Sequence, residues 1–467
     1  MALFTGAEVS AIVGGTVLAG PSALARARIL RVHTDSRSVK KGDLFVALPG
    51  ERFDAHEFVP AAVAAGAAAV VVRADYAPPR AISGAVLFGV ADPLRAYQQL
   101  AAAHRVRFSL PVVAVTGSNG KTTTKEMVAS VLAARWRTMK TEGNLNNRVG
   151  VPQTLFRLNA KYEAAVIEMG VDDMGQTTRL CEIVRPTLGL ITNIGPDHLE
   201  FFKTMDRSAE SKAELLAELP KDGAAILNAD DRYYGLFKKR ARGRVVSFGL
   251  TARAHVRAEE IEPYGRDGTQ FKLVLPGRAR RLAARIRVPG EHNVTNALAA
   301  AAVGVALDVP GSAIVAGLAK FRPAAMRSQI EVRHGVRIIV DCYNANPAST
   351  RAAVRLLAES KTKGRRIAVL GDMLELGPTT AQLHAEVGTY VAEQRIDTLI
   401  ASGVLARNLA KGARIAGMSA VHEAADAPAA AAELLALVAP GDVVLVKGSR
   451  GMRLERVVEA LRTRQRA

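Results

Sequence analysis

The chain has 467 residues, which is too long for one compact core and favours about three domains. Hydrophobic residues make up 49% and charged residues 23%, a composition that excludes an intrinsically disordered chain. The N-terminus lacks the pattern of a signal peptide, and no apolar run outside alanine-rich stretches approaches about twenty residues, so we expect a cytoplasmic protein without stable membrane insertion. Cys181 and Cys342 each lie in an apolar run, which fits buried thiols in a reducing compartment.

The net charge of +19 is the one unusual bulk property. A basic surface attracts phosphates, so it fits nucleic-acid binding, a channel for small polyanionic substrates, or arginines scattered over solvated faces. The basic residues are dispersed, with modest clusters at 238–240 and 278–281, and aromatic residues are 5% of the chain. Because single-stranded nucleic acids are bound on aromatic stacking platforms, we expect no nucleic-acid partner.

Three predicted domains follow one another along the chain. Residues 1–108 form the first, a small mixed α/β domain, with strands predicted over 44–48, 68–72 and 85–90. Residues 109–322 form the second, where strands alternate with helices, a pattern that favours a parallel sheet covered on both faces. Its predicted elements are strands 112–115, 164–169 and 188–194, and helices 121–134 and 207–218.

Residues 323–467 form the third predicted domain, with a doubly wound α/β pattern that places ligands beyond the carboxyl ends of the strands. Its strands are predicted over 337–341, 366–371, 397–403 and 442–448, and its helices over 348–360, 380–394 and 452–464. The predicted fold class is therefore α/β, with a mixed N-terminal domain, a central P-loop-type ATPase domain with a parallel sheet, and a Rossmann-like C-terminal domain.

A glycine-rich turn between the strand at 112–115 and its helix predicts an ATP site. Backbone N–H groups at such a turn point at an anion, and the helix dipole favours negative charge there. Lys121 would neutralise the β- and γ-phosphates, and the hydroxyl of Thr122 is placed to bind Mg²⁺. Val115 stands where the strict loop pattern has a glycine, so this is the shorter T-G-x-x-G-K-T variety. The predicted ATP-binding residues are Thr116, Gly117, Ser118, Asn119, Gly120, Lys121, Thr122 and Thr123.

Two later strand ends carry candidate metal ligands. Glu168 ends a buried strand, where Mg²⁺ would offset the desolvation of a carboxylate, although an acid pointing to solvent explains it too. A rigid Gly-Pro turn then presents Asp197 and His198 after the next strand. A lone histidine is more often structural, but one beside the phosphates fits a second metal ligand.

The sequence resembles the Mur ligase family, which adds amino acids to the peptidoglycan precursor, over essentially the whole chain. The loop alone would not separate one Mur ligase from another, or from folylpolyglutamate synthase. The motifs at 143–147, 341–347 and 370–377 together resemble the member that adds the dipeptide D-Ala-D-Ala. The matching stretches are TDSR at 34–37, FDAH at 53–56, TGSNGKTTTK at 116–125, GNLNN at 143–147, IEMG at 167–170, NIGPDHLE at 193–200, GEHNVTNA at 290–297, DCYNANP at 341–347, LGDMLELG at 370–377 and VKGSR at 446–450.

The resemblance implies a role for each matching residue. Thr122, Glu168 and His198 would bind magnesium, two ions in all. Lys212 resembles in its spacing from His198 a lysine that is carbamylated in the family, and a carbamate offers Mg²⁺ two hard oxygens; an exposed helix lysine paired with Glu210 or Glu214 is the alternative. The further implied roles are Asn293 and Asn296 near the adenine, Arg327 and Asp341 on the ATP between domains, Thr34, Asp35, Ser36, Arg37, Asn144, Asn146 and Asn147 on the UDP substrate, and Asn344, Asn346, Lys447 and Arg450 near the dipeptide.

The implied activity is an ATP-dependent ligation through an acyl phosphate, with Lys121, Glu168, His198 and Lys212 as catalytic groups. The partners would be the small molecules UDP-N-acetylmuramoyl-tripeptide and D-Ala-D-Ala, and we expect a monomer. The base for the incoming amine stays unassigned, because His384 and His292 fit a structural role at least as well.

Three other functions compete with this interpretation. A sister Mur ligase would add a single amino acid, and a basic P-loop ATPase acting on nucleic acid would fit the net charge. A non-catalytic module that binds a UDP-sugar explains only about the first hundred residues. The sequence leaves open whether diaminopimelate or lysine is third in the acceptor peptide.

Overall fold

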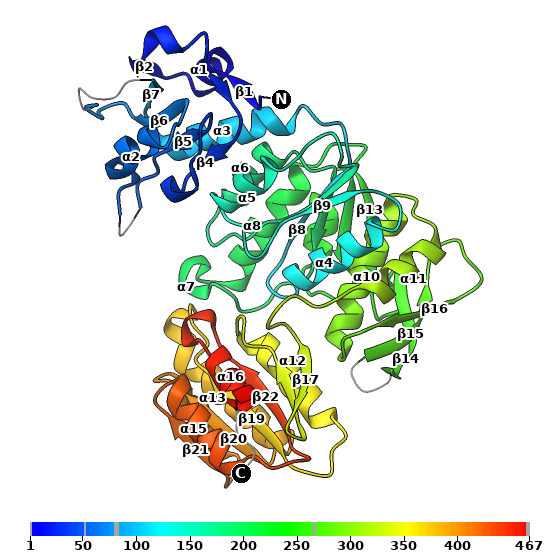
Figure 1. Ribbon diagram of the computed structural model, residues 1–467. Helices are drawn as coiled ribbons and strands as arrows, with labels where there is room; N and C mark the ends of the chain where they lie inside the picture. The colour runs from blue at the N-terminus through cyan, green and yellow to red at the C-terminus, as the bar shows by residue number, and fades with distance from the viewer. Residues whose placement is uncertain (1, 51–52, 79–83, 265–267, 464–467) are drawn as a thin grey trace. The chain divides into compact units, whose positions relative to one another are not determined.

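The computed structural model describes residues 2–50, 53–78, 84–264 and 268–463 (Figure 1). Contacts divide the chain into two compact units. The first contains residues 1–114, 137–170 and 178–187, and the second contains residues 115–136, 171–177 and 188–467. This division differs from the three predicted domains because part of the central region is grouped with the N-terminal region. The predicted boundaries at 108/109 and 322/323 stay predictions.

The N-terminal region is built on a five-stranded sheet with helices on both faces (Figure 1). Alternate strand residues divide between the faces: Leu44 and Val46 pack with α1 and α3, whereas Phe45 packs with α2. Strands β4 to β7 run parallel, and β2 pairs antiparallel with β7. The elements are β2 (Thr16–Ala19), β4 (Val32–His33), β5 (Leu44–Val46), β6 (Ala69–Arg73), β7 (Val86–Val90), α1 (Gly6–Val13), α2 (Val59–Ala64) and α3 (Pro93–Arg105), with a separate pair of β1 (Phe4–Thr5) and β3 (Arg28–Ile29).

The central sheet has nine strands in the order β16-β15-β14-β13-β12-β11-β8-β10-β9. Four of the parallel strands, β8, β10, β11 and β12, are short, fully buried apolar runs, and the sequence predicted β8, β10 and β11 but not β9, β12 or β13. The parallel strands are β8 (Val112–Thr116), β9 (Thr138–Lys140), β10 (Ala164–Glu168), β11 (Leu188–Ile191), β12 (Ala224–Asn228) and β13 (Arg244–Gly249). The helices are α4 (Lys121–Leu132), α5 (Gly150–Leu155), α6 (Gln176–Val184), α7 (Leu199–Phe202), α8 (Met205–Ala217), α9 (Tyr234–Arg240), α10 (Glu291–Ala306) and α11 (Gly311–Lys320).

The sheet ends in three further strands that were not predicted from the sequence. β14 (Val256–Tyr264) pairs antiparallel with β15 (Gly268–Val274), which pairs antiparallel with β16 (Leu282–Ile286). Buried and part-exposed residues alternate along β15 and β16, so neither forms the continuous apolar run that marks a buried parallel strand.

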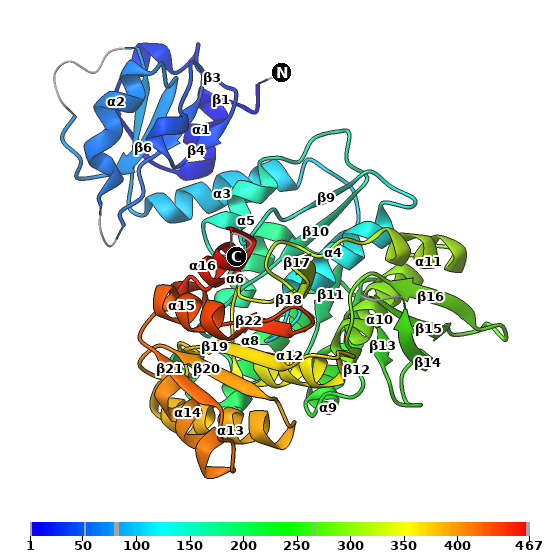
Figure 2. The same cartoon turned by 60° about the horizontal axis from the view of Figure 1, so that its bottom comes forward.

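The C-terminal region is a six-stranded sheet with the order β17-β18-β22-β19-β20-β21, in which only the β17–β18 pair is antiparallel. One face packs on α12, α13 and α14, and the other packs on α15 and α16 (Figure 2). This doubly wound arrangement is the predicted one. Its elements are β17 (Gln329–Arg333), β18 (Val336–Val340), β19 (Arg366–Gly371), β20 (Thr398–Ser402), β21 (Val421–Ala424), β22 (Val443–Lys447), α12 (Pro347–Glu359), α13 (Thr380–Glu393), α14 (Ala406–Ile415), α15 (Ala427–Leu437) and α16 (Glu455–Thr463).

The helix predicted over 452–464 is therefore α16, and Arg464 lies outside the described residues. Both cysteines are buried, as expected, and neither forms a disulfide. Among the described residues, no helix is long and apolar enough to cross a membrane.

Glycines allow α13 and α14 to approach closely. A Cβ atom on Gly388 would lie 1.9 Å from the carbonyl oxygen of Leu409, and one on Gly412 would lie 2.1 Å from that of Ala385. We expect Gly388→Ala to lower the thermal unfolding midpoint by several degrees, because overpacking costs about 1–3 kcal/mol. Gly235→Ala in α9 is the matched control, since its Cβ would meet nothing within 4 Å. Equal midpoints for the two variants would contradict this close contact.

Candidate functional site

The loop between β8 and α4 requires glycine at two positions. Gly117 has φ 134° and Gly120 has φ 78°, backbone conformations that residues other than glycine rarely adopt. A Cβ on Gly117 would lie 2.0 Å from Oγ1 of Thr192, and one on Gly120 would lie 2.5 Å from Oδ1 of Asn296. At both positions, the backbone conformation and the lack of room for a Cβ atom therefore exclude residues other than glycine. The loop leads directly into the first turn of α4, whose N-terminus favours an anion.

The side chain of Asn193 holds the backbone of this loop. Its Oδ1 accepts a hydrogen bond from the N–H of Asn119 at 3.0 Å, and its Nδ2 donates to the carbonyl of Asn119 at 3.1 Å. The carbonyl of Asn193 also accepts from the N–H of Ser118 at 2.8 Å, and the hydroxyl of Thr192 donates to the carbonyl of Asn119 at 2.6 Å. Asn193 lies in the NIGPDHLE motif, but no role was predicted for it, although a polar residue shortly after a buried strand is a usable signal.

Lys121 lies over the loop that precedes it. Its Nζ donates to the carbonyl oxygens of Gly117 at 2.6 Å and Ser118 at 3.2 Å. Thr122, the next residue, is almost fully buried in the first turn of α4. The predicted ATP-binding residues thus form a single loop and helix start, and the ammonium of Lys121 is bonded to the loop backbone.

A buried ion pair lies behind the loop. The hydroxyl of Ser118 donates to Oδ1 of Asp197 at 2.6 Å, and Nζ of Lys212 lies 3.7 Å from Oδ2 of Asp197. Burial opposes ionisation of Asp197, but the charges of Lys212, Lys121 and His198 outweigh it and lower the pKa of this carboxyl. The negative charge of Asp197, which was predicted to lie beside the phosphates, is therefore neutralised by Lys212 within the protein.

Lys212 is 1% exposed, so the alternative of an exposed helix lysine is wrong. Its Nζ donates to the hydroxyl of Ser208 at 2.7 Å and lies 4.9 Å from the ring centroid of Phe202. Burial disfavours the ammonium and lowers its pKa to about 8, even though Asp197 favours the charged form. An amine with this pKa is about one-tenth neutral at pH 7, far more than an ordinary lysine, and only the neutral amine is nucleophilic.

Glu168 ends β10 in the first unit and is 1% exposed. Its Oε1 accepts from Nδ2 of Asn146 at 2.8 Å, and its N–H donates to the hydroxyl of Thr141 at 3.0 Å. Asn146, which was predicted for the UDP substrate, therefore contacts the predicted metal ligand. Asn147 accepts from the N–H groups of Val149 at 3.1 Å and Gly150 at 2.8 Å, and Asn144 is exposed.

His198 adopts a left-handed conformation with φ 50° directly after Asp197. Its Nδ1 lies 2.6 Å from Oε2 of Glu375, in the LGDMLELG motif. The hydrogen bond from His198 is the main cause of a lowered pKa for the Glu375 carboxyl. Of the two ring nitrogens of His198, Nδ1 is thus taken by a carboxylate.

The two asparagines predicted near the adenine lie in the first turns of α10 and are buried. Oδ1 of Asn296 accepts from the hydroxyl of Thr124 at 3.1 Å, and its Nδ2 donates to Oδ1 of Asn293 at 3.3 Å. Nδ2 of Asn293 donates to the carbonyl of Pro289 at 2.8 Å. These bonds join the start of α10 to the helix that follows the phosphate loop.

Asp341 and Lys447 form an ion pair at the carboxyl ends of two neighbouring strands, β18 and β22. Nζ of Lys447 lies 2.6 Å from Oδ2 of Asp341 and donates to the carbonyl of Asn344 at 2.9 Å. The guanidinium of Arg327 lies 4.2 Å from the ring centroid of Tyr343. The four residues Arg327, Asp341, Asn344 and Lys447, predicted for ATP and dipeptide, thus come from one edge of the sheet, where α/β proteins bind ligands. Arg450 pairs with Glu455 at 2.9 Å.

Asn346 uses both side-chain atoms within the protein. Its Nδ2 donates to Oδ1 of Asn119 in the phosphate loop at 2.7 Å, and its Oδ1 accepts from the N–H of Ser349 at 2.9 Å, capping α12. A contact between this residue, predicted near the dipeptide, and the ATP loop was not foreseen. It joins segments 227 residues apart in the sequence.

His384 does not fit the role of a base for the incoming amine. Its Nδ1 donates to the carbonyl of Thr380 at 2.7 Å, and its Nε2 accepts from the N–H of Met373 at 2.9 Å. The side chain is fully buried, and burial lowers its pKa. With both nitrogens bonded to backbone, His384 is a structural residue that supports the LGDMLELG loop. Burial likewise lowers the pKa of His292, the other candidate.

The TDSR motif forms a short turn in the N-terminal region. Asp35 accepts from the N–H of Arg37 at 3.0 Å and from its guanidinium at 2.8 Å. Thr34 and Ser36 are partly buried on either side of Asp35. These bonds are local, so they define the shape of the motif but not what it binds.

The donors predicted for Mg²⁺ fit the ion unequally. Thr122 and Glu168 supply the hard oxygen atoms that Mg²⁺ prefers and that it combines with substrate phosphates. His198 supplies a softer nitrogen, and Lys212 fits only as a carbamate, because an ammonium repels the cation. Over residues 2–50, 53–78, 84–264 and 268–463, no three His, Cys, Asp or Glu side chains come together to hold a metal ion.

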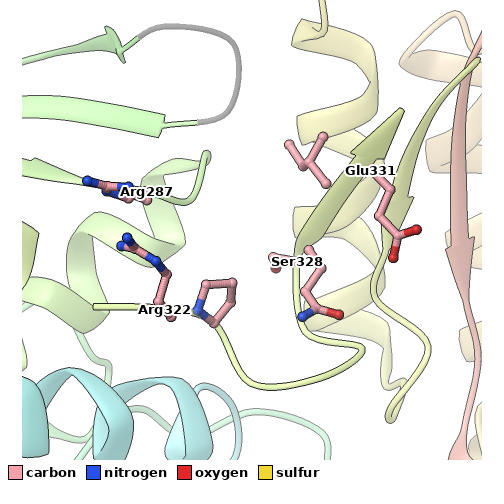
Figure 3. Close-up of a pocket in the computed structure, with 7 residues that line it drawn as sticks. Arg287, Arg322, Ser328 and Glu331 are labelled. Atoms are coloured by element: carbon pink, nitrogen blue, oxygen red, sulfur yellow. The ribbon is translucent and has the colours of Figure 1, made fainter. Parts of the chain in front are cut away.

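A cavity of about 300 Å³ lies beside the segment that leads into β17 (Figure 3). Arg287 and Arg322 lie on one side of it, and Ser328 and Glu331 lie on the other. None of the residues predicted to bind ATP or substrates lines this cavity. The candidate site is therefore defined by the loop and its contacts, and not by this cavity.

Known proteins resemble the chain along its whole length. Sequence profiles of three domains match successive parts: the Mur ligase family catalytic domain at 28–105, the Mur ligase middle domain at 115–304 and the Mur ligase glutamate ligase domain at 326–450. The UDP-N-acetylmuramoyl-tripeptide–D-alanyl-D-alanine ligase of Escherichia coli is 37% identical over 437 residues, which cover 92% of this chain and 93% of that protein.

Solved structures agree with this match. A crystal structure of MurF from Acinetobacter baumannii has a TM-score of 0.91 and 33% identity, and the match covers 99% of both chains. MurF from Thermotoga maritima, solved in complex with ADP, has a TM-score of 0.81 and 27% identity over 92% of this chain and 97% of that one. The predicted three-domain α/β fold is thereby confirmed. The chain belongs to the Mur ligase family.

Proposed function

We propose that the chain is an ATP-dependent amide ligase that joins D-Ala-D-Ala to UDP-N-acetylmuramoyl-tripeptide, giving the pentapeptide precursor, ADP and phosphate. The observation that carries this proposal is the match to relatives of that name over 92% of the chain. The geometry agrees, because the chain has a phosphate loop with a central lysine at the end of a buried strand. We also assign it to the cytoplasm and expect it to act as a monomer.

The chemistry needs activation of a carboxylate. An unactivated carboxylate does not react with an amine at neutral pH, so the substrate carboxylate first attacks the γ-phosphorus of ATP and ADP leaves. The free amine of the dipeptide then attacks the carbon of the acyl phosphate, the nitrogen loses a proton, and phosphate leaves. Because two anions meet in the first step, positioning and charge neutralisation dominate catalysis.

In this proposal the loop residues position the phosphates and neutralise their charge. The backbone N–H groups at the N-terminus of α4 would hold the phosphates, and Nζ of Lys121 would leave the loop carbonyls for the γ-phosphate. Thr122 and Glu168 would be oxygen ligands of Mg²⁺, with His198 at a second ion. Bound Mg²⁺ would supply further neutralisation of the phosphate charge. Asn293 and Asn296 would serve the adenine, and Arg327 and Asp341 would complete the ATP site.

Lys212 would be carbamylated in the active enzyme. The neutral amine attacks carbon dioxide, a C–N bond forms, and one proton is released, which leaves a carbamate with two hard oxygens. The lowered pKa of about 8 and the near-complete burial of Lys212 support this step, since both favour the neutral, nucleophilic amine. A carbamate is an anion that would bind Mg²⁺, in contrast to the ammonium.

The remaining assignments concern the two substrates. Thr34, Asp35, Ser36 and Arg37, with Asn144, Asn146 and Asn147, would bind the UDP-linked substrate. For the dipeptide we propose Lys447, Arg450, Asn344 and Asn346. The position of Lys447 at the carboxyl end of β22 supports this assignment, because α/β domains bind ligands at that edge.

The reaction is tested by mass spectrometry of products formed from UDP-N-acetylmuramoyl-tripeptide, ATP and D-Ala-D-Ala. We expect a pentapeptide product, and acceptors with diaminopimelate or lysine as third residue should be compared. Phosphate release that needs a single amino acid instead of the dipeptide would identify a sister ligase. Stimulation of ATP hydrolysis by polynucleotide alone would favour the nucleic-acid ATPase.

Lys121→Ala should abolish turnover while the circular dichroism spectrum stays unchanged, because the γ-phosphate loses its point charge. An effect of about a thousandfold or more on kcat is expected for a group of this kind. Lys161→Ala is the control, since Lys161 is an exposed lysine outside the site. Retained ATP-dependent ligation in Lys121→Ala would remove this residue from catalysis.

Carbamylation is tested with ¹³C-labelled carbon dioxide and NMR. We expect a carbamate signal in the wild type that disappears in Lys212→Ala and persists in Lys203→Ala. At a fixed concentration of dissolved carbon dioxide the signal should increase from pH 7 to pH 8.5, because the neutral fraction of an amine with pKa about 8 increases over that range. A wild-type protein without this signal would show that Lys212 acts as an amine.

A further inference from the structure

The turn that follows β12 contacts the segment that holds the phosphate loop. Asn228, the last residue of β12, is buried, and its Nδ2 donates to the carbonyl of Thr192 at 3.1 Å. Its Oδ1 accepts from the N–H of Asp230 at 3.0 Å, so the side-chain orientation is fixed at both ends. The carbonyl group immediately before Asn193 is thereby held in place.

Asp231 holds the other side of Asn193. Its Oδ2 accepts from the N–H of Ile194 at 2.8 Å, and its Oδ1 accepts from the N–H of Tyr233 at 2.8 Å. Bonds from N–H groups to a carboxylate are stronger than those between neutral groups. Burial raises the pKa of Asp231, and these two bonds oppose that effect.

Asn193 is therefore fixed through the backbone on both sides. Its side chain in turn makes two hydrogen bonds to the backbone of Asn119, and its carbonyl accepts from Ser118. A shift of this segment would move the N–H of Ser118 and Asn119 together. Both N–H groups are bonded to Asn193, so such a shift would pass through them to the N-terminus of α4. The N–H groups at that helix start would point at a phosphate, and binding in such loops depends on their geometry.

We propose that Asn228 and Asp231 are positioning residues for the nucleotide-binding loop, acting through Asn193. This inference rests on the proposed binding of ATP at residues 116–123. It predicts that the loss of either side chain weakens nucleotide binding selectively, although neither residue is part of the loop itself.

Asp230 provides a matched control within the same turn. Its carboxylate accepts from the N–H of Leu250 at 2.5 Å and from the hydroxyl of Thr251 at 2.5 Å. In the part of the chain that the structure describes, its carboxylate bonds to Leu250 and Thr251 and not to residues 192–194. Asp230→Asn therefore repeats the chemical change of Asp231→Asn at an adjacent position without disturbing Asn193.

The experiment measures the dissociation constant of Mg²⁺-ADP by titration calorimetry for the wild type, Asp231→Asn, Asn228→Asp and Asp230→Asn. The isosteric changes replace an acceptor by a donor at Asp231 and a donor by an acceptor at Asn228. We expect a rise of about tenfold or more for these two variants, since each leaves a buried backbone group without its partner. For Asp230→Asn we expect less than about a twofold change.

Two further readouts separate positioning from a loss of stability. Thermal melting should show comparable shifts for Asp231→Asn and Asp230→Asn, and the titrations are made where every variant is folded. In the ligation assay, KM for ATP should rise in Asp231→Asn while KM for D-Ala-D-Ala stays unchanged.

Wild-type affinity for ADP in both Asp231→Asn and Asn228→Asp would overturn the inference and leave the proposed function intact. Equal weakening in Asp230→Asn would also overturn it, because the effect would then belong to the turn as a whole. A wild-type protein that does not bind Mg²⁺-ADP would instead refute the proposed ATP site, and this inference with it.

Discussion

Two hydrogen bonds between the side chain of Asn193 and the backbone of Asn119 define the phosphate loop. The loop turns through glycines at φ 134° and 78°, and glycine is the residue that loses most conformational freedom on folding. Such a turn keeps one shape only where its neighbours hold it. The side chains that do so follow β11 and β12, which places the support for the loop on two buried strands.

Charge neutralisation is the second constraint on this region. Asp197 and Lys212 are both buried, and a buried charge is tolerated only with a partner and hydrogen bonds. Ser118 and Ser208 supply those bonds, so the pair is tied to the loop on one side and to α8 on the other. Burial lowers the pKa of Lys212 to about 8, and the charge of Asp197 only partly offsets this effect, so the neutral, nucleophilic amine is favoured relative to an exposed lysine. One arrangement thus serves stability and the proposed chemistry together.

Several residues make contacts with distant parts of the chain that were not predicted from the sequence. Asn346 was predicted near the dipeptide from its motif, yet its amide contacts Asn119. His384 was a candidate base, but both of its ring nitrogens form hydrogen bonds to the backbone. The hairpin strands β14 to β16 escaped prediction because their burial alternates with exposure, whereas the apolar runs of β8, β10 and β11 were recognised from composition alone. In each case the missing information was which segments meet in space.

The sequence by itself determined the α/β class, the family and the position of the phosphate loop. The class and the loop follow from local rules, since buried strands are continuous apolar runs and a glycine-rich turn before a helix binds anions. The family follows from the resemblance of the motifs along the chain. Only the tertiary structure decided that Lys212 is buried beside Asp197, and that Asn228 and Asp231 fix the segment around Asn193. Burial and pKa depend on groups brought together from distant parts of the chain, and residue spacing along a sequence does not encode those distances.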